Sequence, residues 1–175
     1  MEDERGKMSK KEWPDILTLA LGIALLPSIW AVISPYIRIS TGAVALICAA
    51  VYVANGNKIE DGIKISIGFL CGDIWACFAL KMMDIMQFNP NVELFITLFV
   101  LGLLAVIISG LFTKWIYLPA WLCGWAVGLT IMTTDRINNL GSLAIQIGLS
   151  MLVGVWYVGA GVDKFQKFLF KLYNR

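Results

Sequence analysis

The stretch CGDIWACF, residues 71–78, places a carboxylic acid, Asp73, inside a long apolar run. The basic residues nearest to it in the sequence are Lys64 and Lys81, at the edges of that run. An aspartate at the centre of a membrane helix costs about 2.5 to 3.5 kcal/mol on insertion scales, and such residues generally face a protein interior or a water-filled cavity. Asp73 is therefore expected to be either a protonated carboxyl group or a carboxylate that holds a bound cation or water. Both states make it a candidate for solute binding. The alternative is a carboxyl group that only bonds a neighbouring helix.

Two further groups of side chains could assist Asp73. Gln146 and Ser150 are four residues apart, so on a helix they share one face, and that face could meet Asp73. Aromatic rings beside a carboxylate could hold an amine by cation–π attraction, although packing and lipid contact are the ordinary roles of such residues. The predicted substrate-binding residues are Asp73, Trp75, Trp121, Trp125, Gln146 and Ser150.

Enzyme chemistry is not expected. The chain has no histidine, which removes the usual general base and the commonest zinc ligand. Its four cysteines all lie in apolar runs and form no CxxC pair, so they are expected to be buried thiols rather than disulfides or zinc ligands. We therefore predict no catalytic residue, no metal site and no cofactor.

The composition predicts an integral membrane protein. Of the 175 residues, 59% are hydrophobic and only 15% are charged, whereas a soluble domain usually has about 25% charged residues. The apolar residues fall in repeated runs that approach the roughly 20 residues needed to cross a bilayer as a helix. A net charge of +2 with no basic stripe gives no sign of nucleic-acid binding. The first partner of the chain is therefore the lipid bilayer.

Six apolar segments predict an all-α, polytopic membrane protein with six transmembrane helices. The predicted spans are residues 16–37, 39–54, 63–83, 94–112, 115–133 and 140–161. The expected organisation is a cytoplasmic N-terminal segment at 1–15, a six-helix membrane domain at 16–162 and a basic amphipathic tail at 163–175. The tail either lies on the cytoplasmic membrane surface or continues the last span into water.

The positions of the basic residues predict the orientation. With the N-terminus inside, only Arg38, Lys81 and Arg136 of the 14 lysines and arginines fall on the outer side. Basic residues concentrate in cytoplasmic loops, so both termini are expected in the cytoplasm. The even number of predicted spans agrees with this orientation.

Small residues recur at helical spacing in two spans. Gly68, Gly72 and Ala76 form one small-xxx-small ridge, and Ala120, Gly124 and Gly128 form another. Such ridges let helices approach closely, and lining a narrow pore is the alternative role.

The three spans of each half could also be inverted copies of each other, as in many transporters and channels. In that scheme the short second span corresponds to the fifth, which proline and glycine interrupt. A second span with no special role is the alternative.

A family resemblance follows from several short stretches. These are IWAVISPYIRISTG at residues 29–42, the segment 52–56, GDIWA at 72–76 and YLPAWLCG at 117–124. Together they resemble an uncharacterised domain-of-unknown-function family of small, six-span bacterial inner-membrane proteins. The resemblance implies the plasma membrane of a bacterium and carries no activity. In that family the position of Asp73 is not an acid throughout, so Asp73 would mark the substrate of a subgroup.

We expect a channel or secondary transporter for a small polar solute, with Asp73 in the pathway. The solute could be an amine, an amide such as urea, or a weak acid. The small size favours a compact pore or carrier, and we expect a homo-oligomer of this chain. Two alternatives stay open. One is the substrate-binding membrane subunit of a vitamin-type transporter, and the other is a non-transporting scaffold or sensor.

Overall fold

A computed structural model of the chain describes residues 13–134 and 140–173. Every regular element in these ranges is a helix, so the predicted all-α fold is confirmed for the described residues. Four helical stretches are long and apolar enough to cross a membrane, namely Ile16–Ile37, Ile59–Ile85, Pro90–Leu111 and Leu140–Lys171. The helices Val44–Ala54 and Leu118–Thr134, in the other two predicted spans, are apolar but shorter. By length and composition the chain is that of a multi-pass membrane protein.

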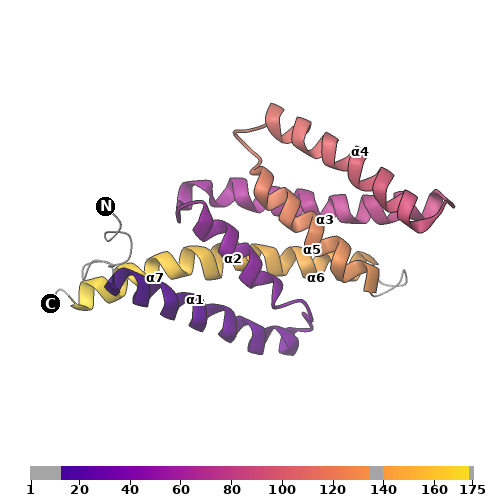
Figure 1. The fold of residues 1–175 in the computed structure, drawn as a ribbon. Helices are drawn as coiled ribbons and strands as arrows, with labels where there is room; N and C mark the ends of the chain where they lie inside the picture. The colour runs from indigo at the N-terminus through magenta and orange to yellow at the C-terminus, as the bar shows by residue number, and fades with distance from the viewer. Residues whose placement is uncertain (1–12, 135–139, 174–175) are drawn as a thin grey trace, which may run out of the picture.

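The helices follow the predicted spans closely (Figure 1). The elements are α1 (Trp13–Ile33), η1 (Ser34–Ile37), α2 (Val44–Ala54), η2 (Ile59–Asp61), α3 (Gly62–Ile85), α4 (Pro90–Leu111), α5 (Leu118–Thr134), α6 (Leu140–Val153), η3 (Gly154–Gly159) and α7 (Ala160–Tyr173). The elements η1 and η2 are 3-10 turns and η3 is a π-helical segment. Because α6, η3 and α7 follow one another directly, the predicted tail continues the sixth span as helix up to residue 173. Of the predicted N-terminal segment, residues 1–12 lie outside the described residues.

Local sequence sets where α4 begins. The Asn89 side chain accepts a hydrogen bond of 3.0 Å from the backbone N–H of Asn91, and Pro90 is the first helical residue. An asparagine cap followed by proline favours a helix start, because the cap satisfies a free N–H and proline needs none. The helix therefore begins at residue 90 rather than at the predicted 94.

The second span begins later than predicted, at Val44 rather than at residue 39. Arg38 has a φ of 62°, which is left-handed backbone and ends the preceding turn. The chain then passes close to η1 at Gly42, where a Cβ atom would collide with the Ser34 hydroxyl group. Residues 39–43 therefore form a connection between helices rather than part of α2. The helix α2 itself has 11 residues, a length of about 17 Å.

The two small-residue ridges pack against each other within one chain. α5 makes most of its contacts with α3. A Cβ atom on Gly72 would lie 2.5 Å from the backbone nitrogen of Trp125, and one on Gly124 would lie 2.7 Å from the carbonyl oxygen of Phe69. The backbones of the two helices are therefore in direct contact, as the ridges predict.

A second close contact joins α2 to η3. A Cβ atom on Gly154 would lie 2.5 Å from the carbonyl oxygen of Ala45, and one on Gly159 would lie 2.7 Å from the Tyr52 ring. Figure 1 shows α1 beside α7, and α3 running opposite to the α6–α7 stretch. α1 and α2 thus pack on the last helical stretch, whereas α4 and α5 pack on α3, and α3 meets α6 in the middle.

Candidate functional site

Asp73 lies where α3, α5 and α6 meet. Its side chain is buried, with 6% of its surface exposed. A Cβ atom on Gly128 of α5 would lie 3.5 Å from Oδ1 of Asp73, and one on Gly148 of α6 would lie 3.5 Å from Oδ2. The carboxyl group therefore sits between two positions without side chains, one on each neighbouring helix.

One oxygen of the Asp73 carboxyl group lacks a hydrogen-bond partner. The Oδ1 atom is fully buried and has no hydrogen-bond partner. Within the described ranges, the ion pair that forms is between Lys167 and Asp163. No basic side chain there forms an ion pair with Asp73. An unpartnered buried polar group is costly, and far more so if it is charged. The site therefore suits a hydrogen-bond donor, a cation, or the proton of the carboxyl group itself.

The three predicted tryptophans gather on the side of α4. The Trp75 indole N–H donates a hydrogen bond of 3.1 Å to the carbonyl oxygen of Leu101 in α4. The Trp121 ring meets the Trp75 ring edge-on, with centroids 5.3 Å apart. Trp125 lies 3.9 Å from the position that a Cβ atom on Gly102 of α4 would take. These contacts place the rings between α3, α4 and α5.

No tryptophan atom is among those nearest to the two glycine positions that face Asp73. Around the Gly128 position the nearest atoms belong to Ala76, Asp73 and Met132, and around Gly148 to Leu70 and Asp73. The Nε1 atoms of Trp121 and Trp125 are buried without a partner. The contacts of the three rings thus form an aromatic cluster against α4, and cation–π binding beside Asp73 stays a prediction.

Gln146 and Ser150 share a face of α6, as predicted, but hydrogen bonds tie that face to the chain before α2. The Gln146 side-chain oxygen accepts bonds from the backbone N–H of Ser40, at 3.0 Å, and from its hydroxyl group, at 3.1 Å. The hydroxyl groups of Thr41 and Ser150 are 3.1 Å apart. Successive helical residues are turned by about 100°, so Gly148, between the two polar residues, points the other way, toward Asp73. No described hydrogen bond joins either residue to Asp73.

Two pockets open at one end of the bundle, and neither is lined by Asp73. The larger, about 530 Å³, is called here the Asp84 pocket. It is lined by Leu80, Lys81, Met83, Asp84, Gln87, Glu93, Met132, Thr133 and Leu140. The smaller, about 350 Å³, is lined by Ser40, Thr41, Ala43, Val44, Ile131, Thr134 and Leu143. Sequence reasoning did not single out either pocket, because each collects residues from the ends of several helices.

The remaining chemistry of the described residues is limited. No group of three or more cysteine, aspartate or glutamate side chains there is placed to hold a metal ion. The four cysteines are free thiols, of which Cys48 is buried and the others are half-buried.

Comparison with known proteins finds one family. Residues 20–167 match a family described as "Protein of unknown function (DUF1097)". No curated protein and no solved structure matches the chain. The matched region contains Asp73 and both of its glycine neighbours.

Proposed function

The chain belongs to the DUF1097 family, whose description names no activity, and we propose that it is a membrane channel or secondary transporter for a small polar solute. The observation that carries the proposal is the buried, unpartnered carboxyl oxygen of Asp73 at the junction of three helices. Ionisable residues inside membrane spans generally mark solute or ion pathways. The reaction proposed is binding and passage, without covalent chemistry.

The geometry favours a solute that donates hydrogen bonds. Asp73 has no described donor, so an amine or an amide such as urea would supply what Oδ1 lacks. An amine would also bring the positive charge that the protein does not provide. The anion of a weak acid would be repelled by an ionised Asp73, so it fits only if one of the two groups carries a proton. Amines and amides are therefore the first solutes to test.

Uptake into liposomes that contain the purified protein tests the proposal. Methylammonium, urea and acetate represent the three solute classes. We expect Asp73→Asn to slow uptake of the transported solute by about tenfold or more, because a hydrogen bond to a charged group contributes about 1.5 to 3 kcal/mol and each 1.4 kcal/mol is a factor of ten. Glu60→Gln is the matched control, since Glu60 is exposed on η2. Equal uptake by wild type and Asp73→Asn would remove Asp73 from the pathway.

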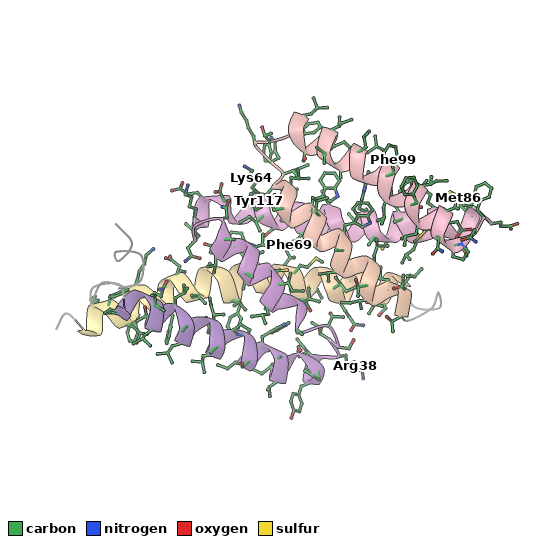
Figure 2. All side chains as sticks on the ribbon, viewed as in Figure 1. Arg38, Lys64, Phe69, Met86, Phe99 and Tyr117 are labelled. Carbon is green, nitrogen blue, oxygen red and sulfur yellow. The ribbon has the colours of Figure 1, made fainter. Side chains whose placement is uncertain are left out.

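The proposed setting is the plasma membrane of a bacterium, with six spans and both termini in the cytoplasm. The short helices α2 and α5 are included as spans, because both pack among the long helices. Figure 2 shows Lys64 and Tyr117 toward one end of the bundle and Arg38 and Met86 toward the other. The basic residues before α3 and α5 support the assignment of the first end to the cytoplasm.

The proposal also includes an inverted repeat and a homo-oligomer. A long, a short and a long helix follow one another in each half of the chain, and Figure 1 shows α1 and α4 running in opposite directions. This order supports two inverted three-helix repeats. The face of α4 that carries the stacked rings of Phe95 and Phe99 is exposed and apolar, so lipid or a second copy of the chain could cover it.

A non-transporting scaffold or sensor is the second candidate. It is favoured by one observation, that neither pocket is lined by Asp73. In that case Asp73 would be a protonated carboxyl group held in a closed junction. Liposomes with the wild-type protein would then take up none of the three solutes faster than empty liposomes.

A further inference from the structure

Met132 is a buried residue that lines the Asp84 pocket. It lies near the end of α5 and is 1% exposed. The rim of the same pocket carries polar side chains from α3 and α4, including Asp84 and Glu93. Met132 is thus in contact with both the pocket and the protein interior.

The opposite side of Met132 faces the surroundings of Asp73. The Cε atom of Met132 lies 3.7 Å from the position that a Cβ atom on Gly128 would take, and Oδ1 of Asp73 lies 3.5 Å from that same position. The Sδ atom of Met132 lies 3.7 Å from the Sγ atom of Cys77. Cys77 is one helical turn after Asp73 on α3, between Asp73 and the pocket end of that helix. Met132 therefore lines the Asp84 pocket and also lies beside the Gly128 position that Asp73 faces.

We propose that the Asp84 pocket is the entrance to Asp73 and that the Met132 side chain closes it. Methionine is unbranched and has three rotatable bonds, so its thioether end can swing aside without movement of the backbone. A Cβ atom on Gly128 would lie 2.5 Å from the Cβ atom of Ala76 and 3.5 Å from Oδ1 of Asp73, so Met132 is the flexible side chain at this closely packed contact. This inference rests on the proposed function for its solute, but the barrier itself can be tested without transport.

The charges of the pocket agree with the solutes favoured above. One basic residue, Lys81, and two acidic residues, Asp84 and Glu93, line it. In the part of the chain that the structure describes, none of the three forms an ion pair within 4.0 Å. The Glu93 side chain accepts a hydrogen bond of 2.6 Å from the backbone N–H of Phe88. An excess of negative charge at an entrance raises the local concentration of cations, so the pocket favours an amine over an anion.

Cys77 gives a direct readout of the barrier. The full-length protein in liposomes is treated with a charged, membrane-impermeant methanethiosulfonate reagent, and each cysteine is then quantified by mass spectrometry of its peptide. Cys77 is half-buried and its Sγ atom lies 3.7 Å from Sδ of Met132, so we expect slow labelling of Cys77 in the wild type. In Met132→Ala we expect labelling at least about tenfold faster at Cys77. Equal labelling of Cys77 in the two proteins would overturn the inference.

The chain supplies its own controls for this experiment. Met83→Ala also shortens a methionine that lines the pocket, but no described contact joins Met83 to Cys77, so labelling should stay at the wild-type rate. Cys71 and Cys123 are half-buried elsewhere in the bundle and report on folding. Their parallel labelling in Met132→Ala would mean general opening and would count against a local barrier. Met132→Leu keeps the volume and should keep Cys77 protected.

The barrier and the proposed function fail in different ways. If Met132→Ala exposes Cys77 while no solute is taken up by any variant, the entrance is supported and the proposed transport is not. If uptake depends on Asp73 while Cys77 stays unlabelled in Met132→Ala, the solute reaches Asp73 by another route and the inference is wrong.

Discussion

Gly72→Val is expected to lower the free energy of unfolding by about 3 kcal/mol or more. A Cβ atom at this position would meet the backbone of α5, at the carbonyl oxygen of Trp121 and at the nitrogen of Trp125. Backbone atoms cannot rotate away as the end of a side chain can, so α3 and α5 would have to separate. That separation would also disturb Asp73, the next residue on α3. Unfolding in mixed micelles, followed by circular dichroism, measures the loss.

Gly110→Val is the matched control for this prediction. Gly110 lies in α4 and nothing lies within 4 Å of the position that its Cβ atom would take. Both variants place the same branched residue in a helix, so any common effect of helix propensity cancels. A similar loss of stability in the two variants would show that α3 and α5 are not in backbone contact at Gly72.

Asp73→Ala is expected to raise the free energy of unfolding by about 1 to 3 kcal/mol, while uptake is lost. The insertion cost of an aspartate at the centre of a span is about 2.5 to 3.5 kcal/mol, and alanine avoids most of it. Some of that gain is offset by the contacts that the smaller side chain no longer makes. Residues that serve function at the expense of stability commonly behave in this way. The same micelle titration gives the change in stability.

Asp61→Ala provides the comparison with a partnered aspartate. Asp61 accepts a hydrogen bond of 2.8 Å from the Asn55 side chain, so its loss is expected to destabilise the protein by about 1 kcal/mol. If Asp73→Ala destabilises the protein as well, Asp73 makes a structural hydrogen bond. That result would favour the scaffold or sensor.

The sequence predicts the helices well, because the apolar runs are long and the polar joints are clear. The small-residue ridges predict close helix packing but do not give the partner helix, and the structure pairs α3 with α5 at Gly68, Gly72 and Gly124. The start of α2 at Val44 could not be predicted from hydropathy. Residues 39–43 carry no charge to mark the start of the helix, which the left-handed Arg38 and the close approach at Gly42 set instead.

The candidate site could be predicted only in part. Asp73 stands out in the sequence because an acid in an apolar run is rare. Its neighbours do not stand out, because glycines such as Gly128 and Gly148 have no side chain to suggest a role. The sequence predicts that Gln146 and Ser150 share a helix face. Which segment this face contacts depends on how the helices pack, and in the structure it contacts Ser40 and Thr41. Tryptophan spacing likewise does not distinguish packing against α4 from a solute wall.

Direct contact between the solute and Asp73 is measured by protection from chemical modification. A hydrophobic carbodiimide adds to a carboxyl group inside the membrane, and mass spectrometry locates the adduct, with Asp73→Asn as the blank. We expect the transported solute to slow modification of Asp73 by about tenfold at saturation, whereas a solute of similar size that is not taken up leaves it unchanged. Equal modification of Asp73 with and without the transported solute would contradict the claim that Asp73 lies in the pathway.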